Sequence, residues 1–347
     1  MRISSRIFGV TAQGETVTEF TLTNRGGVCA KILDYGAILR QLWVPDRSGG
    51  SVDIVLGYDD LSSYEKDHST CMGAVVGRVA GRIKGAAFTL HGSTYRLEAN
   101  DGANHLHGCF PHRVWAATVT GDGLRLRYHS PDGEEGFPGT VDVQLCFTLD
   151  DNNVLSMKYE AASDADTIFN LTSHSYYNLN GHDSGCADDH LLQIASDSFL
   201  EMADDSCPTG QILPTAGSMM DFTRLQRIGR GFPVACEQME LVGGYDHYFI
   251  LRPEAAPAAM LYAPKTGIAM TIATTEPGVL FYSGNYLEEN PLPGKGGTRY
   301  VGRGGIALET QQYPGAAAHP EFPSILLRRG HKREGTTLWQ FQVLNQE

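Results

Sequence analysis

In Val141-Asp-Val-Gln-Leu-Cys-Phe-Thr-Leu149, apolar and polar side chains alternate, and Asp150-Asp-Asn-Asn153 and Val154-Leu-Ser-Met-Lys-Tyr159 follow directly. An alternation with a period of two residues places the apolar side chains on one face of a β-strand. The Asp and Asn residues favour a turn, so the last stretch is expected to return as the antiparallel partner strand. This segment predicts a β-hairpin with one buried face.

Similar pairs of short apolar segments around a polar turn recur along the chain. They are residues 87–90 with 94–97, residues 260–262 with 268–272, and Val44 with residues 52–55. Helical patterns are few: residues 60–66 and 221–228 each make about two turns. Many short strands with few helices predict an all-β fold, either a sandwich or a barrel. The Gly- and Pro-rich stretch 290–297 is expected to be a loop of the kind that borders sites.

The composition limits the possible partners. The 347 residues include 27 Lys and Arg against 40 Asp and Glu, a formal net charge of -13. This charge opposes binding to nucleic acid or to an anionic membrane surface, so neither is expected as a partner. No segment has the apolar length of about 18 residues that spans a bilayer, and the N-terminus lacks the apolar run of a signal peptide. The seven cysteines are odd in number and contain no CxxC pair, which favours a reducing compartment, and the sequence predicts a cytoplasmic protein.

Motifs for common cofactors are missing. The chain contains no GxxxxGK[ST] loop, no GxGxxG after a strand, no HExxH and no GxSxG. These absences disfavour an ATPase, a dinucleotide enzyme, a zinc peptidase and an α/β-hydrolase. The sequence therefore predicts that the protein uses neither a cofactor nor a metal.

Two histidines in Asn104-His-Leu-His-Gly108 form the first polar cluster, which follows Gly77-Arg-Val-Ala-Gly-Arg-Ile83. In an extended strand, His105 and His107 would share one face and could line a cleft or hold a metal pair. No third ligand lies at a recognisable spacing, which makes a zinc site weak. An ordinary pair of hydrogen-bonded strand histidines stays open as the alternative.

Three further segments hold polar residues in strand-like surroundings. His174 lies among hydroxyls and amides, where its titration range suits proton transfer. Asp246 follows two glycines and could accept hydrogen bonds from sugar-like hydroxyls. Glu309 ends an apolar strand, where a partly buried carboxylate could act as a base. Each has an ordinary structural alternative: a polar strand end, a Gly-Gly turn and a surface glutamate, respectively.

Taken together, these motifs resemble the aldose 1-epimerase family. The matching segments, in family order, are GRxxxRI at 77–83, NxLHG at 104–108, NLTxHSYxNLxG at 170–181, GGYDH at 243–247, TTxPG at 274–278, and LETQ at 308–311 with FPSILL at 322–327. One such motif would be weak evidence for the family, whereas the presence of all of them in family order is specific evidence. The resemblance implies a large antiparallel β-sandwich, the galactose mutarotase-like supersandwich, with few short helices.

The resemblance also implies roles for individual residues. Glu309 resembles the general base that takes the proton of the anomeric hydroxyl, and His174 the general acid that protonates the ring oxygen. Residues similar to those that bind the sugar are Arg82, His107 and Asp246, with Tyr176 and Glu276 as further candidates. The implied reaction interconverts the α and β anomers of a free aldohexose such as galactose or glucose, without a cofactor.

Three positions depart from the family pattern. Gly81 stands where many members have asparagine, Cys109 replaces a glycine after LHG, and Glu276 stands where some relatives have glutamine. These changes are expected to affect sugar preference more than the type of reaction.

Several alternatives remain open from the sequence. They are an epimerase of a phosphorylated hexose, a non-catalytic sugar-binding protein on the same fold, and a glycosidase using Glu309 and Asp246. Length alone suggests about two domains, but the spread of the expected site from residue 82 to residue 309 predicts a single domain over 1–347. The expected assembly is a monomer or a weak homodimer.

Overall fold

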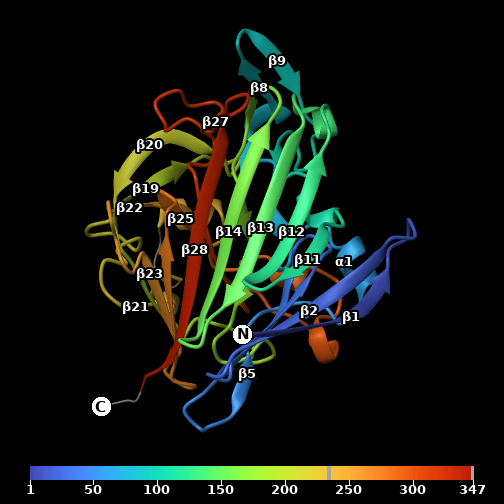
Figure 1. The fold of residues 1–347 in the computed structure, drawn as a ribbon. Coiled ribbons are helices and arrows are strands. Elements are labelled where there is room, and N and C mark those ends of the chain that lie inside the picture. The colour runs from blue at the N-terminus through green and yellow to red at the C-terminus, as the bar shows by residue number, and fades with distance from the viewer. Residues whose placement is uncertain (233–235, 345–347) are drawn as a thin grey trace.

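Three antiparallel sheets contain most of the described strands. The computed structural model describes residues 1–232 and 236–344. The largest sheet has nine strands, in the order β11 (Ala116–Thr120), β12 (Gly123–Ser130), β13 (Val141–Leu149), β14 (Val154–Ser163), β28 (Lys332–Val343), β24 (Ile268–Thr274), β23 (Ala259–Tyr262), β18 (Leu191–Ile194) and β21 (Gln226–Arg227). Figure 1 shows β28, β14, β13 and β12 side by side across the molecule.

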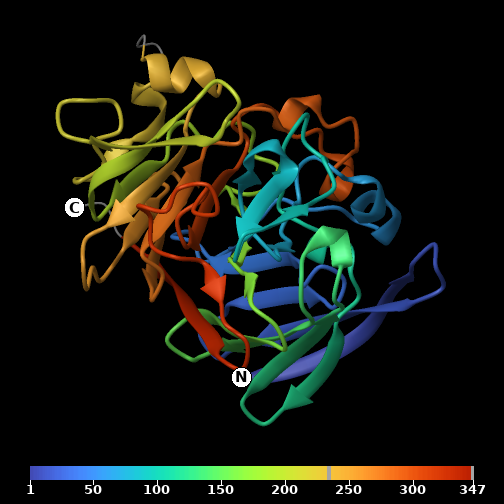
Figure 2. The same ribbon diagram turned by 90° about the horizontal axis from the view of Figure 1, so that it is seen from above.

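The other two large sheets have six and five strands. The six-stranded sheet has the order β17 (Tyr176–Tyr177), β26 (Ile306–Gln311), β25 (Gly278–Tyr282), β22 (Asp246–Leu251), β19 (Ser196–Met202) and β20 (Pro208–Pro214). The five-stranded sheet has the order β1 (Arg2–Val10), β2 (Thr16–Thr23), β3 (Cys29–Leu33), β4 (Leu39–Pro45) and β5 (Ser51–Asp53). Figure 2 shows the blue N-terminal strands and the yellow and orange strands on different sides of the molecule.

Four short two-stranded pairs, two α-helices and several short 3-10 turns accompany these sheets within the described residues. The pairs are β6 (Val75–Val76) with β16 (Thr172–Ser173), β7 (Arg82–Ile83) with β10 (His105–Leu106), β8 (Ala87–Leu90) with β9 (Ser93–Arg96), and β15 (Thr167–Ile168) with β27 (Leu326–Leu327). The helices are α1 (Leu61–Lys66) and α2 (Glu237–Leu241). Within the described ranges, no helix is both long enough and apolar enough to cross a membrane.

The hairpin predicted at residues 141–159 is confirmed. Strands β13 and β14 pair antiparallel, with Leu149 opposite Leu155. Burial alternates along β13 as the sequence pattern requires, because its apolar side chains face the core. The other predicted hairpins are also present as β8–β9, β23–β24 and β4–β5.

One of the two predicted helices forms. Helix α1 begins after Asp60, whose carboxylate accepts a hydrogen bond from the Ser63 amide at 2.9 Å. The helix expected at 221–228 was wrong. Asp221 instead caps a local turn by accepting from the Thr223 amide at 3.0 Å, and the carbonyl of Phe222 accepts from the Ile194 amide at 2.8 Å. Because these bonds compete with helix formation, the segment runs along the sheet and includes β21.

One cluster of buried apolar side chains joins the three large sheets. It includes Leu42 of the five-stranded sheet, Leu145 of the nine-stranded sheet and Phe281 of the six-stranded sheet. The polar residues of the expected site are carried by β7, β22 and β26 and by turns beside β10 and β16. The shared core therefore supports a site that is assembled from distant parts of the chain.

Candidate active site

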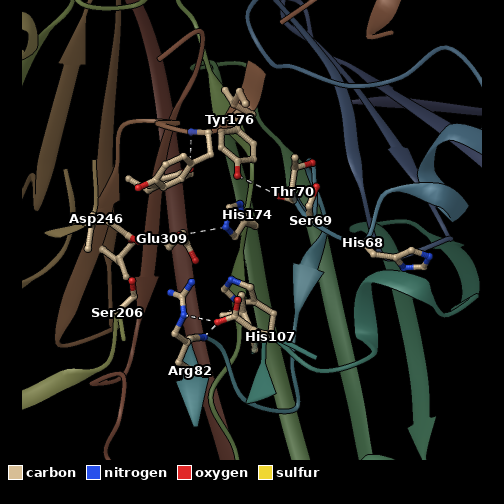
Figure 3. Close-up of a pocket in the computed structure, with 18 of the residues that line it drawn as sticks. His68, Ser69, Thr70, Arg82, His107, His174, Tyr176, Ser206, Asp246 and Glu309 are labelled. Atoms are coloured by element: carbon tan, nitrogen blue, oxygen red, sulfur yellow. Dashed lines mark hydrogen bonds and ion pairs between the residues drawn. The ribbon is translucent and has the colours of Figure 1, made fainter. Parts of the chain in front are cut away.

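A cavity of about 440 Å³ lies where the six-stranded sheet meets the short strands β7 and β10 (Figure 3). The sequence-predicted residues that line it are Arg82, His107, His174, Tyr176, Asp246 and Glu309. They come from segments more than 200 residues apart in sequence, since Arg82 is in β7 and Glu309 in β26. The structure thus brings most of the predicted site residues to one cavity.

Glu309 is held by the most buried strand of the site. All residues of β26 are buried, and Glu309 itself is 2% exposed. Its Oε1 lies 3.5 Å from Nε2 of His174, and Figure 3 shows the two side chains pointing toward each other. Within the described residues, neither Oε2 of Glu309 nor Nδ1 of His174 has a hydrogen-bond partner in the protein. The pair is therefore free to exchange protons with a bound molecule.

Burial favours the uncharged form of both partners. It raises the pKa of Glu309 well above its usual range; the carboxylate of Asp246 adds to this effect, and the Arg82 guanidinium opposes it. Burial also lowers the pKa of His174 to about 4. Because the two groups face each other, they titrate as a pair that holds one proton over a wide pH range.

His174 is positioned by its backbone as well as by its neighbours. It lies in the turn between β16 and β17, where its amide donates to the carbonyl of Ala74 at 2.7 Å and its carbonyl accepts from the Gly73 amide at 3.1 Å. Its ring packs 5.1 Å from the ring of His107 and 5.0 Å from that of Tyr176. These contacts restrict the imidazole to one orientation toward Glu309.

His107 and His105 do not share a face, contrary to what an extended segment would give. Strand β10 ends at Leu106, and His107 has a positive φ of 64° that turns it toward the cavity. His105 is fully buried instead, with Nδ1 bonded at 2.7 Å to the carbonyl of Glu98. The histidine pair is therefore no metal site, because the left-handed residue at 107 sends the two rings to different places.

The tautomer of His107 follows from its contacts. Its Nδ1 accepts a hydrogen bond from the Gly81 amide at 3.3 Å, so the neutral ring carries its proton on Nε2. Burial holds the pKa of His107 well below the ordinary value, and His174 and Arg82 lower it further. His107 therefore offers an N–H donor.

Arg82 and Asp246 form the charged part of the cavity next to Glu309. Nε of Arg82 donates to Oδ2 of Asp101 at 2.7 Å. Asp246 begins β22, and burial raises its pKa to about 6, with the Arg82 guanidinium acting in the opposite direction. The bond to Asp101 thus orients Arg82, while its charge acts on the Asp246 and Glu309 carboxylates, which are acceptors for a polar ligand.

Glu276 and Cys109 lie outside the cavity lining. The Glu276 carboxylate accepts from the Tyr159 hydroxyl at 2.8 Å and from Nε2 of Gln312 at 2.7 Å. The expected contact of Glu276 with a sugar therefore has no support in this geometry. Cys109 packs into the apolar core. Only Gly81 among the three departures lines the cavity, with a φ of 81° that favours glycine over other residues.

Part of the cavity wall was not predicted from the sequence. The residues without a recognisable sequence signal include His68, Thr70, Asp101, Ser206, Tyr282 and Tyr286. The glycine- and proline-rich stretch did point to one member of the wall, because Asn290 lines the cavity. Across residues 1–232 and 236–344, no group of three or more His, Cys, Asp or Glu side chains is arranged to hold a metal ion.

Comparison with known proteins places the sequence among aldose 1-epimerases. The sequence model of the family described as aldose 1-epimerase matches residues 18–340. Galactose mutarotase from Sus scrofa is 37% identical, with 98% of this chain and 99% of that protein covered. Aldose 1-epimerase from Escherichia coli (strain K12) is 32% identical, with 94% and 96% covered.

Solved structures resemble the fold closely. The GalM/aldose epimerase homologue from C. elegans superimposes with a TM-score of 0.87 at 27% identity, covering 94% of this chain and 98% of that one. Galactose 1-epimerase from Lactobacillus acidophilus gives a TM-score of 0.86 at 28% identity, covering 99% of both chains. The all-β supersandwich expected from the sequence is therefore confirmed. From its sequence, its fold and its matches over nearly the whole length, the chain belongs to the aldose 1-epimerase family.

Proposed function

We propose that this aldose 1-epimerase acts on free aldohexoses such as galactose and glucose, with Glu309 as general base and His174 as general acid. The observation that carries the assignment of roles is the facing pair itself: Oε1 of Glu309 lies 3.5 Å from Nε2 of His174 in a cavity lined by polar side chains. A carboxylate and an imidazole supply the two proton transfers that ring opening requires.

Ring opening of a cyclic aldose moves two protons. The hemiacetal loses the proton of its O1 hydroxyl to the Glu309 carboxylate, and the ring oxygen O5 gains a proton from the His174 imidazolium. The C1–O5 bond breaks as C1 becomes a carbonyl carbon. Rotation about the C1–C2 bond and reclosure from the other face give the other anomer, with base and acid exchanging roles.

Burial of the pair supports this cycle. The charged combination, carboxylate with imidazolium, is the one that the dry cavity disfavours, because burial raises the pKa of Glu309 and lowers that of His174. Opening the ring converts that combination into carboxyl and neutral imidazole. The proton transfers thus relieve an unfavourable charge arrangement in one direction and restore it during reclosure.

Four other residues that line the cavity are assigned to substrate binding. His107 presents an Nε2–H donor and Arg82 a guanidinium, both suited to the lone pairs of the ring oxygen and its neighbours. Asp246 accepts hydrogen bonds from sugar hydroxyls, and Tyr176 supplies an aromatic wall. Contact of Glu276 with the sugar is not part of this proposal.

The charge of the cavity favours a neutral sugar over a phosphorylated one. Among the described lining residues, Arg82 is the one Lys or Arg side chain, whereas Asp101, Asp246, Glu289 and Glu309 are acidic. A sugar phosphate would bring two negative charges next to these carboxylates.

The test is to follow the optical rotation of freshly dissolved α-D-galactose, α-D-glucose and glucose 6-phosphate with and without the protein. We expect faster equilibration of the two free sugars. A clear preference for the 6-phosphate would overturn the substrate assignment. Sugar binding by calorimetry without any acceleration would instead favour a non-catalytic binding protein.

The organisation of the whole protein belongs to the same proposal. A cavity built from residues 68 to 309 around one shared core supports a single domain over 1–347. The odd, widely spaced cysteines support a cytoplasmic setting. We propose a monomer or a weak homodimer, which sedimentation at several concentrations would test.

The pH profile of the interconversion rate should be bell-shaped. Below the His174 pKa of about 4 the pair carries two protons, so no base remains; above the raised pKa of Glu309 it carries none, so no acid remains. Asp246, with a pKa of about 6, should add a second acidic step. We expect kcat/KM, corrected for the buffer-catalysed rate, to fall on both sides of a maximum and Asp246→Asn to remove the step near pH 6. A monotonic profile for the corrected rate would contradict the shared-proton pair.

A further inference from the structure

Asp67 is a buried carboxylate outside the proposed acid/base pair, at the end of α1. It is 4% exposed, and its oxygens accept from the Tyr58 hydroxyl at 2.9 Å, from the Ser69 amide at 3.1 Å and from the Thr70 amide at 3.0 Å. The Thr70 hydroxyl donates to it as well. So many donors converging on one carboxylate hold the loop that begins at residue 67 in a single conformation.

The same carboxylate contacts a second loop of the cavity wall. Nδ2 of Asn290 lies 3.4 Å from Oδ1 of Asp67 and 2.7 Å from the hydroxyl of Tyr58. His68, Ser69 and Thr70 line the cavity from the first loop, and Leu287, Glu289 and Asn290 line it from the second. Asp67 therefore ties together two wall segments that are more than 200 residues apart in sequence.

A short chain of contacts leads from Asp67 to His174. Thr70, fixed by Asp67 at its amide and hydroxyl, accepts at its carbonyl a hydrogen bond of 3.2 Å from the Tyr176 hydroxyl. The Tyr176 ring packs 5.0 Å from that of His174, and Figure 3 shows this contact beside Thr70. The backbone bonds of His174 to Gly73 and Ala74 belong to the continuation of the same loop. Any shift of the 67–71 loop would thus move the imidazole relative to Glu309.

The negative charge of Asp67 also supports the role of His174 as an acid. The titratable groups that face His174 are Glu309 from β26, His107 from the end of β10 and Tyr176 from β17. Beyond these, the Asp67 carboxylate raises the pKa of His174 and so opposes part of the effect of burial. The negative charge therefore favours the protonated imidazole that ring opening needs.

We propose that Asp67 is a positioning residue for the acid of the site: it fastens the loops at 67–71 and 287–292 and sets the orientation of His174 toward Glu309 through Thr70 and Tyr176. This inference rests on the proposed role of His174. It assigns Asp67 no contact with the sugar.

The kinetic test uses two isosteric variants and two controls. Asp67→Asn keeps the shape but puts an NH₂ group among donors, and we expect kcat to fall about 10-fold or more with a smaller change in KM. Thr70→Val should lower kcat in the same direction, while Thr70→Ser, which keeps the hydroxyl, should retain the wild-type value. Asp60→Asn neutralises an exposed carboxylate at the other end of α1 but keeps an oxygen that can cap the helix, and should leave kcat per folded molecule unchanged.

A second readout does not depend on activity. In the sugar-free protein, the imidazole ¹⁵N signals of His174, assigned with His174→Asn, should shift in Asp67→Asn and in Thr70→Val but not in Asp60→Asn or Thr70→Ser. The His174 ring of Asp67→Asn should also take up its proton at lower pH than in the wild type. Unchanged His174 signals and an unchanged kcat in folded Asp67→Asn would overturn the proposal. An inactive wild-type protein with shifted signals would refute the epimerase role instead and leave the positioning intact.

Discussion

Replacing Glu309 with glutamine is expected to lower kcat for anomer interconversion by about 10²–10⁴-fold, the usual contribution of a general base. The amide has nearly the same shape as the carboxyl group and can still accept a hydrogen bond from the sugar. Because the amide cannot take the O1 proton, kcat should fall. Because sugar binding is largely kept, KM should change much less than kcat. Optical rotation of α-D-galactose against time, with protein concentration set by folded fraction, measures both constants.

Glu276→Gln is the matched control for this variant. Glu276 is also a buried glutamate, 6% exposed. Its carboxylate accepts a hydrogen bond from Gln312, the residue that follows β26, the strand of Glu309. Because its carboxylate is outside the cavity lining, its neutralisation should change kcat less than about 3-fold, within the range of an indirect effect. Equal losses in the two variants would show that buried charge in general, and not the base at position 309, sustains the rate.

The second large effect is expected on stability. The Lys295 and Asp53 side chains are 3% and 2% exposed, and Nζ donates to Oδ2 of Asp53 at 2.6 Å. Nζ also donates to the carbonyls of Val55 at 2.7 Å and Arg40 at 3.1 Å. Lys295→Met would leave a buried carboxylate and two carbonyls without their donor, and should lower the free energy of unfolding by about 3–5 kcal/mol. Urea denaturation followed by circular dichroism measures this loss.

An exposed ion pair in the nine-stranded sheet provides the comparison. Lys158 and Glu334 are 4.0 Å apart, with side chains 59% and 51% exposed, and Lys158→Met should change the unfolding free energy by no more than about 1 kcal/mol. Adding Asp53→Asn to Lys295→Met should recover part of the loss, because it removes the stranded charge. Similar losses for Lys295→Met and Lys158→Met would contradict the structural role of the buried pair.

Strand patterns carried most of the fold prediction. The alternation in residues 141–159 and the turn residues between its halves depend on local sequence, so the hairpin β13–β14 could be derived from the amino-acid pattern alone. The segment at 221–228 failed for the opposite reason. Asp221 can cap either a helix or a tight turn. The turn forms because the Phe222 carbonyl accepts a hydrogen bond from the distant Ile194 amide, which no local pattern reveals.

Sequence motifs revealed the acid and base of the site, but not the buried charged residues that support the structure around it. Glu309, His174 and Asp246 lie in segments with an unusual mixture of polar residues. Asp67 and Lys295 have no such signal, because each gains its importance from neighbours that are distant in sequence. The positive φ at His107 was equally hidden, and it separates two histidines that a strand pattern would have kept together.

The central claim is that Glu309 and His174 act as one proton-transfer unit on a free aldose. Two-dimensional exchange NMR of the anomeric protons of galactose at equilibrium measures the α–β interconversion rate directly, for the wild type, Glu309→Gln, His174→Asn and the double variant. Because the two residues serve the same step, we predict cross-peaks for the wild type, a large loss in each single variant, and a double variant about as slow as the slower single one. Exchange that stays at the wild-type rate in both single variants, or losses that multiply in the double variant, would contradict the account.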